Sequence, residues 1–221
     1  MASRREQERI ARVVLDAHGQ TFAGELAIPV ERNTPSPLFQ LLCAALLFSA
    51  RIRASAAADA ARALADHGWT TPEKLAASTW EDRTRVLNAA GYARYDERTA
   101  TMLGETAHLL LDEYAGDLRR LREAADRDPA AERRRLKAFK GIGDVGVDIF
   151  FREAQVAWDE LFPFADRTTL KAAKRLGLPA SAQGLADLVD TDDFPRLVAG
   201  LVRVHLAKAY DDVEAAAGAA K

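Results

Sequence analysis

The segment at residues 136–151, LKAFKGIGDVGVDIFF, constrains the fold of this chain more than any other stretch. Gly141 and Gly143 can adopt backbone angles that other residues resist, so the chain can turn tightly around them. Ile142, the apolar residue between them, can insert into a core. The pattern predicts the end of one helix, a hairpin on Gly141-Ile142-Gly143 and the start of a second helix.

The same segment has the chemistry of an anion site. The N–H groups in the first turn of a helix that begins after Gly143 lack intrahelical partners and can bind an anion. A glycine hairpin of this kind fits a nucleic-acid phosphate. The spacing fits an ordinary turn between helices, with a solvated basic face, equally well. The cations of this region are Arg133, Arg134, Arg135, Lys137 and Lys140.

Helical patterns fill the rest of the 221-residue chain, which is long enough for one large domain or two small, interlocked ones. Alanine is abundant and only 7% of the residues are aromatic, which favours helices over sheets. The clearest helical patterns lie at residues 38–50, 96–114 and 194–210, and no stretch alternates like a strand. The sequence predicts an all-α protein.

The single cysteine and the short apolar stretches exclude several classes of site, whereas the net charge excludes none. Cys43 is the only cysteine, so a disulfide, a cysteine-ligated zinc site or an iron–sulfur cluster cannot form within one chain. The longest apolar stretch, residues 38–48, is too short to span a bilayer, and the N-terminus lacks an apolar signal-peptide core. We therefore expect a cytoplasmic protein without membrane contact. The net charge of −2 still permits nucleic-acid binding, because phosphate contacts need only a local basic face.

Asp166 is the residue best placed for chemistry. It follows the apolar loop FPFA at residues 162–165 and precedes a helix rich in lysine and arginine. A carboxylate at the mouth of an apolar pocket can stabilise a cationic sugar or activate water. Its type and position also suit an N-cap for a helix beginning at Thr168, and one residue can fill both roles. Arg51 ends the apolar helix, and we expect it to project to solvent or to a partner, because burial of an unpaired charge is costly.

Taken together, three segments resemble the helix-hairpin-helix DNA glycosylase superfamily, which includes endonuclease III. They are SPLFQLLCAALLFSAR, LNAAGYARYDERTATML, and the hairpin LKAFKGIGDVGVDIFF followed by ADRTTLKAAKRLGL. The resemblance covers roughly residues 36–178. It implies an all-α, two-domain architecture in which a damaged base is flipped into the cleft between the domains. Residues 36–158 would form a helical barrel domain with the hairpin, and residues 1–35 plus 159–221 the second domain.

The resemblance also assigns roles to individual residues. Asp166 matches the catalytic aspartate of the family. Arg51 lies where the family often has a glutamine that fills the gap left by the flipped base. The hairpin match implies contact with the DNA backbone, often with a bound monovalent cation, Na+ or K+, at Gly141 and Gly143. The residues that the resemblance places at the DNA are Lys140, Gly141, Ile142, Gly143, Val145 and Arg51.

Departures from the family pattern narrow the expected chemistry. Bifunctional members have a lysine at the position of Val145, and valine cannot form their Schiff base with the sugar. The C-terminal four-cysteine iron–sulfur motif is absent, Lys140 replaces the usual proline of the hairpin, and Thr168 stands where a histidine is common.

These residues lead to one expected function. We expect a monofunctional DNA glycosylase of base excision repair, active as a monomer without a cofactor on double-stranded DNA containing a lesion. An alkylated purine is the expected base, because a cationic leaving group needs little help from an acid. Two alternatives remain: a non-catalytic DNA-binding protein that uses the same hairpin, and a helical protein-interaction domain.

Overall fold

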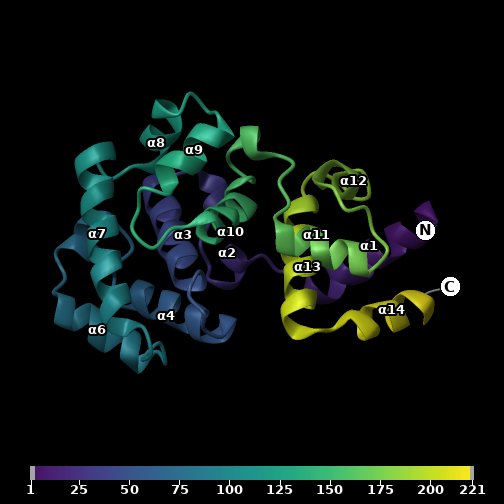
Figure 1. Ribbon diagram of the computed structural model, residues 1–221, viewed down its shortest axis with the longest axis horizontal. Coiled ribbons are helices and arrows are strands. Elements are labelled where there is room, and N and C mark those ends of the chain that lie inside the picture. Colours follow the sequence, from purple (N-terminus) through teal and green to yellow (C-terminus); the bar gives the residue numbers. More distant parts are fainter. Residues whose placement is uncertain (1–2, 220–221) are drawn as a thin grey trace. The chain divides into compact units, whose positions relative to one another are not determined.

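A computed structural model describes residues 3–219, and within that range every regular element is helical, as the sequence predicts (Figure 1). The chain divides into two compact units. Residues up to Glu25 and from Leu161 onward form unit 1, whereas residues from Leu26 to Glu160 form unit 2. Among the described residues, no helix is both long and apolar enough to cross a membrane.

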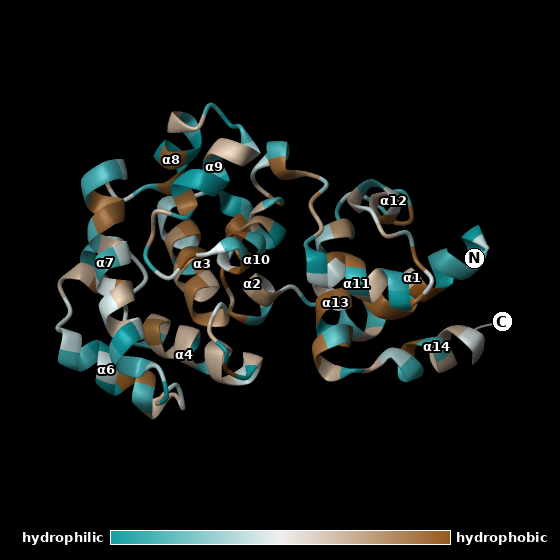
Figure 2. Ribbon diagram, viewed as in Figure 1, coloured by the Kyte–Doolittle hydropathy of each residue, from teal (hydrophilic) through white to brown (hydrophobic). Residues whose placement is uncertain are grey.

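Unit 2 is built around one buried helix, α3 (Pro35–Phe48), which is brown along most of its length in Figure 2. Helices α4, α7, α8 and α10 pack against it, so it is apolar on nearly every side. Cys43 lies within this core, and burial raises the pKa of its thiol, as expected of an inert cysteine. The other elements of unit 2 are η1 (Val30–Arg32), α4 (Ala54–Asp66), α5 (Pro72–Ala76), α6 (Trp80–Ala89), α7 (Asp96–Tyr114), α8 (Leu118–Ala124), α9 (Pro129–Leu136) and α10 (Asp144–Ala154), with η2 (Asp159–Leu161) at its boundary.

Unit 1 joins the two ends of the chain. The purple helix α1 and the yellow helix α13 lie side by side in Figure 1 and share a core that includes Val14, Leu197 and Leu201. They approach so closely that a Cβ atom on Gly200 would lie 2.8 Å from Cγ1 of Val14. The helices of unit 1 are α1 (Arg4–His18), α2 (Phe22–Glu25), α11 (Arg167–Arg175), α12 (Ala182–Ala186), α13 (Phe194–Ala207) and α14 (Tyr210–Ala219).

The unit boundaries differ from those expected from the sequence. The expected division placed residues 26–35 with the termini, but in the structure they belong to unit 2. The physical reason is that η1 packs against α3 and α10, and that Trp158 Nε1 donates a hydrogen bond of 3.3 Å to Asn33 Oδ1. The first boundary therefore lies after residue 25 rather than 35, and the second after residue 160 rather than 158.

Candidate functional site

The predicted hairpin joins α9 to α10 in unit 2. Gly141 has φ +92°, a conformation that strains any residue with a side chain, and a Cβ atom there would also lie 2.6 Å from Sδ of Met102. Ile142 is 3% exposed, as expected, and its N–H donates a 3.0 Å hydrogen bond to the carbonyl oxygen of Phe139. The turn and its packing therefore require glycine at position 141.

Gly143 differs from Gly141 in this respect, which corrects the expectation that both glycines adopt unusual angles. Its backbone is extended, with φ −96° and ψ −165°, and a Cβ atom there would have no atom within 4 Å. The fold does not need glycine at this position. A side chain at position 143 would occupy the open space next to the first turn of α10.

The start of α10 has the features of an anion site. Gly143 is its N-cap residue and provides no side chain to accept from the first turn, whose N–H groups have no intrahelical acceptor. The helix is 11 residues long, so its dipole adds positive potential at this end. Val145 in the first turn is 61% exposed. The residue that the sequence resemblance matches to the lysine of bifunctional members is therefore an exposed apolar side chain.

The basic residues around the hairpin are mostly paired with carboxylates of the same unit. Lys137 Nζ lies 2.8 Å from Asp144 Oδ1, and this contact lowers the pKa of Asp144. Lys140 Nζ lies 2.9 Å from Oε1 of Glu105 on α7. Arg133 pairs with Asp148 at 2.6 Å. The solvated basic face expected from the sequence is therefore largely neutralised in the free protein, although exposed pairs of this kind each contribute only about 0–1 kcal/mol.

A pocket of about 250 Å³ adjoins the hairpin in unit 2. It brings together the end of α3, the loop before α7, the first turns of α7 and Gly141. Arg51 and Gly141, ninety residues apart in sequence, line the same pocket, together with Arg98, which the sequence analysis missed. Tyr92 anchors the wall by donating a 2.7 Å hydrogen bond to the carbonyl oxygen of Leu47, and burial raises the pKa of Tyr92 to about 12. The full lining is Leu46, Ser49, Ala50, Arg51, Tyr92, Tyr95, Arg98, Thr99, Met102 and Gly141.

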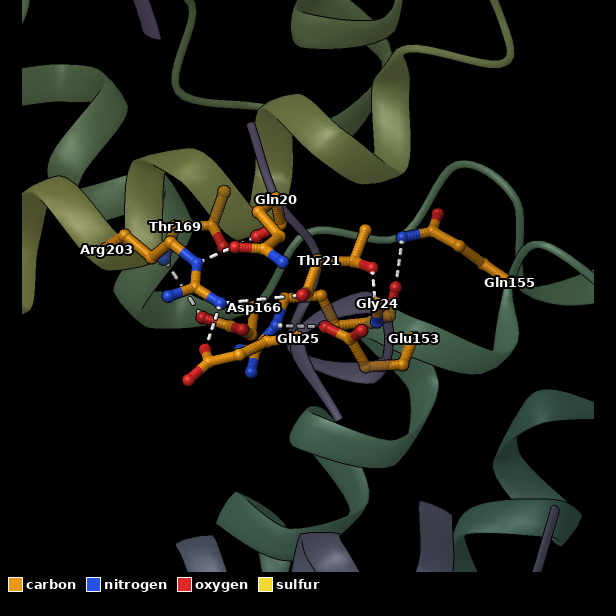
Figure 3. Close-up of polar contacts among 10 residues, drawn as sticks. Gln20, Thr21, Gly24, Glu25, Glu153, Gln155, Asp166, Thr169 and Arg203 are labelled. Carbon is orange, nitrogen blue, oxygen red and sulfur yellow. Dashed lines mark hydrogen bonds and ion pairs between the residues drawn. The ribbon is translucent and has the colours of Figure 1, made fainter. Parts of the chain in front are cut away.

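Asp166 lies in unit 1 and is 6% exposed. It is the N-cap residue of α11, and its Oδ1 accepts a 2.9 Å hydrogen bond from the backbone N–H of Thr169 (Figure 3). The predicted capping role is confirmed, with the helix beginning at Arg167, one residue earlier than expected. This bond fixes the orientation of a nearly buried carboxylate at the start of a helix whose charged side chains are exposed.

Arg203 contacts the segment around α2 in unit 1, and Figure 3 draws it in the same view as Asp166. Its guanidinium, on α13, donates to the carbonyl oxygen of Gln20 at 2.7 Å and pairs with Glu25 at 2.6 Å. It also lies over the ring of Phe22, 4.3 Å from the ring centroid. Arg203 therefore fixes the segment that contains α2, a role for which the sequence offers no local signal.

A second polar group missed by the sequence analysis lies inside unit 2. Glu132 of α9 is 0% exposed, and burial together with the neighbouring Glu160 raises its pKa to about 8. Burial would also raise the pKa of Glu160, but hydrogen bonds from Arg122 and from Glu132 outweigh this effect and bring it to about 2. Arg122 Nε donates to Glu160 at 2.6 Å, and its guanidinium lies over the ring of Trp158. At neutral pH Glu132 is therefore protonated beside an ionised Glu160.

Metal-ligating side chains do not cluster in the part of the chain that the structure describes. No group of three or more histidine, cysteine, aspartate or glutamate side chains there is arranged to hold a metal ion. The Na+ or K+ ion implied at Gly141 and Gly143 would use main-chain oxygens and stays a prediction.

Comparisons with known proteins give a match in structure but not in sequence. No protein-family model matches the chain, and no curated protein does. A solved structure of a trapped covalent intermediate of endonuclease III with DNA, an estranged-adenine complex, matches with a TM-score of 0.57. The match covers 92% of this chain and 86% of that chain at 17% sequence identity, which establishes a shared fold. This chain thus has the fold of endonuclease III, and the resemblance to helix-hairpin-helix DNA glycosylases is confirmed at the level of fold.

Proposed function

We propose that this protein is a monofunctional DNA glycosylase of base excision repair. The observation that carries the proposal is the oriented, nearly buried carboxylate of Asp166 in a chain with the endonuclease III fold. A carboxylate that is shielded from water acts more strongly on developing positive charge than one in bulk solvent. Asp166 is therefore assigned the electrostatic role at the sugar.

The proposed reaction is hydrolysis of the bond between C1′ of the sugar and the nitrogen of the damaged base. Water attacks C1′ as the C1′–N bond breaks, and the electron pair of that bond leaves with the base. Asp166 stabilises the positive charge that develops on the sugar and accepts the proton of the attacking water. Because the bond is inaccessible inside stacked DNA, the base must first be flipped out of the duplex.

We assign binding of the DNA backbone to unit 2. The uncapped first turn of α10 offers N–H groups to a phosphate, and the open space at Gly143 lets the phosphate approach them. Lys140 lies on the same hairpin and would exchange its contact with Glu105 for the phosphate. Arg51, which is exposed at the pocket beside the hairpin, would fill the gap in the duplex.

Val145 supports the monofunctional part of the proposal. The endonuclease III structure that shares this fold is a covalent intermediate with DNA. Valine has no nucleophile with which to form such an intermediate, so water is the expected attacking group here. We further propose an alkylated purine as the substrate, because its positively charged ring leaves as a neutral base without an acid.

A screen of duplexes, each with a single lesion, tests this function. Abasic sites should form with at least one alkylated purine, and Asp166→Asn should slow their formation by about 100-fold or more. Asparagine also caps helices well, so this variant keeps the fold of α11. Excision at an unchanged rate by the variant would refute the mechanism. Trapping of a covalent adduct by borohydride would refute the monofunctional assignment.

One observation favours a second candidate, a non-catalytic DNA-binding protein with the same hairpin. Asp166 already has a structural role as the N-cap of α11, which accounts for its presence without catalysis. This alternative predicts tight binding to duplexes with an abasic site and no excision of any lesion. Asp166→Asn would then leave both binding and stability unchanged.

A further inference from the structure

Thr169 of α11 has a hydroxyl group that the fold leaves unused. The residue is 0% exposed, and its backbone N–H donates the 2.9 Å hydrogen bond to Asp166 Oδ1. Its Oγ1 is buried and has no hydrogen-bond partner among residues 3–219. A buried hydroxyl without a partner lowers stability, so its presence calls for an explanation.

Local structure offers this hydroxyl two ordinary acceptors that it does not use. In a helix, threonine commonly donates to the carbonyl oxygen three or four residues earlier, which here belongs to Asp166 or Ala165. Neither bond is present. The other buried residues of α11 are Ala172 and Ala173, so this face of the helix packs in an apolar environment. Valine, which has nearly the shape of threonine and no hydroxyl, would serve folding better.

The hydroxyl lies on the turn that holds the carboxylate of Asp166. Side chains of an α-helix lean toward its N-terminus, and residues three apart share a face. The side chain of Thr169 therefore leans toward the first turn of α11, which Asp166 caps (Figure 3). Rotation about χ1 moves a threonine hydroxyl between two preferred positions in a helix. The hydroxyl can thus turn toward Asp166 without movement of the backbone.

A second donor from Thr169 would act on the carboxylate in two ways. Together with the N–H of Thr169, it would fix the plane of the carboxylate as well as its position. A hydrogen bond to the ionised form also favours that form, which is the one that stabilises positive charge on a sugar. Burial makes such a bond electrostatically stronger than the same bond in water.

Resting on the proposed function, we propose that Thr169 is a positioning residue whose hydroxyl donates to the carboxylate of Asp166 in the complex with DNA. The bond is absent from the free protein and forms as Asp166 turns to face the sugar. An interaction that is made in the reacting complex and withheld before it raises the rate of the chemical step rather than the affinity for the substrate.

Thr169→Val tests the proposal, because it should change stability and activity in opposite directions. Thermal unfolding followed by circular dichroism should show a melting temperature about 2–4 °C higher, since the unpaired hydroxyl is gone. The single-turnover rate constant for excision at saturating protein should fall about tenfold, while the half-saturating protein concentration stays unchanged. Thr169→Ser keeps a hydroxyl at this position and should restore the rate.

Thr106→Val is the matched control. Thr106 of α7 is also 0% exposed, and its Oγ1 likewise has no partner within the part of the chain that the structure describes. It lies in unit 2, whereas Asp166 lies in unit 1. Its replacement should raise the melting temperature by a similar amount and leave the excision rate unchanged.

Binding to abasic analogues tests the same hydrogen bond without a chemical step. One duplex contains a neutral tetrahydrofuran, and the other contains a pyrrolidine whose protonated ring nitrogen imitates the positive charge that develops on the sugar. Wild-type protein should bind the pyrrolidine duplex more tightly by about tenfold or more, measured as Kd by fluorescence anisotropy. Thr169→Val should reduce this preference, and Thr169→Ser should keep it.

Three results would overturn the inference. Thr169→Val could lower the melting temperature, which would mean that the hydroxyl has a structural partner such as a buried water. It could keep the wild-type preference for the pyrrolidine duplex, or Thr169→Ser could excise as slowly as Thr169→Val. A wild-type protein that excises no lesion yet shows the Thr169-dependent preference would lose the glycosylase function and keep this inference. Excision by Thr169→Val at the wild-type rate would do the reverse.

Discussion

Sδ of Met102 occupies the space that a side chain on Gly141 would need, because a Cβ atom at position 141 would lie 2.6 Å from it. This contact packs the hairpin against α7. At Gly143 the corresponding space is empty. The two glycines of one short hairpin are therefore present for different reasons: the first for the fold and the second for what approaches from outside.

Substitution of the two glycines should separate stability from DNA binding. Gly141→Ala should destabilise unit 2 by about 2 kcal/mol, since a left-handed alanine costs roughly 1–2 kcal/mol and Met102 must also move. Gly143→Ser should raise stability by a few tenths of a kcal/mol because serine caps helices better than glycine, yet it should weaken DNA binding. Urea unfolding followed by tryptophan fluorescence checks stability, since Trp69, Trp80 and Trp158 all lie in unit 2. Unchanged DNA affinity in Gly143→Ser would mean that no phosphate binds there.

Two substitutions of Asp166 should separate its capping role from its chemical role. Asp166→Ala removes the acceptor for the Thr169 N–H and should destabilise unit 1 by about 1 kcal/mol. Asp166→Asn keeps an acceptor oxygen and should be close to wild type in stability. Both should slow excision by about 100-fold or more. Thermal unfolding by circular dichroism, run beside the excision assay, measures the two effects. Equal destabilisation by both variants would show that the negative charge itself, rather than the cap, stabilises α11.

The Glu132 carboxyl predicts a fall in stability as pH rises. Its pKa is about 8 in the folded protein, above its ordinary value of 4.5, so the folded state holds a proton that the unfolded state has released between these values. The free energy of unfolding should therefore decrease from about pH 5 to pH 8. Glu160 has a pKa of about 2, and its contribution is lost only as pH falls below about 4.5, outside this window.

Glu132→Gln tests this dependence, because glutamine preserves the shape and cannot ionise. Urea unfolding of unit 2 at pH 5, 6, 7 and 8 should show a shallower decline in the variant than in the wild type. Glu31→Gln is the matched control, since Glu31 is an exposed glutamate of the same unit. Parallel curves for wild type and Glu132→Gln would mean that Glu132 is ionised throughout.

Release of Lys140 from Glu105 should strengthen DNA binding. Glu105→Gln removes the carboxylate 2.9 Å from Lys140 Nζ, which leaves the cation free for a phosphate and removes a repulsive charge. We expect higher affinity and a salt dependence steeper by about one released counterion. Stability should change by less than about 1 kcal/mol. Titrations across a range of salt concentrations measure both quantities. Glu113→Gln, an exposed glutamate further along α7, controls for net charge, and an equal gain in that variant would exclude a specific role for Lys140.

Features encoded by neighbouring residues could be predicted from the sequence. The hairpin at Gly141-Ile142-Gly143 and the cap at Asp166 each depend on residue types within a few positions, and both are present. The all-α class follows from the same local patterns. The all-α class and the hairpin could therefore be predicted from the sequence alone.

Features that depend on tertiary contacts could not be predicted. Lys140 meets Glu105 across 35 residues of sequence, so the neutralised hairpin has no local signal. Glu132 lies in the charged stretch PAAERRRL and resembles a solvated residue until it is placed beside Arg122 and Glu160. Arg98 lies within the segment that carried the family resemblance, and only the shared pocket connects it with Arg51.

The pairing of α1 with α13 has a consequence for synthesis on the ribosome. All residues of unit 2 are contiguous, so this unit can fold once Glu160 has emerged. Helix α1 is made first but must wait for α13, with Ile10, Val14 and Leu15 uncovered in the meantime. The order of completion therefore runs from the middle of the chain outward, and the apolar face of α1 stays uncovered until α13 has been made.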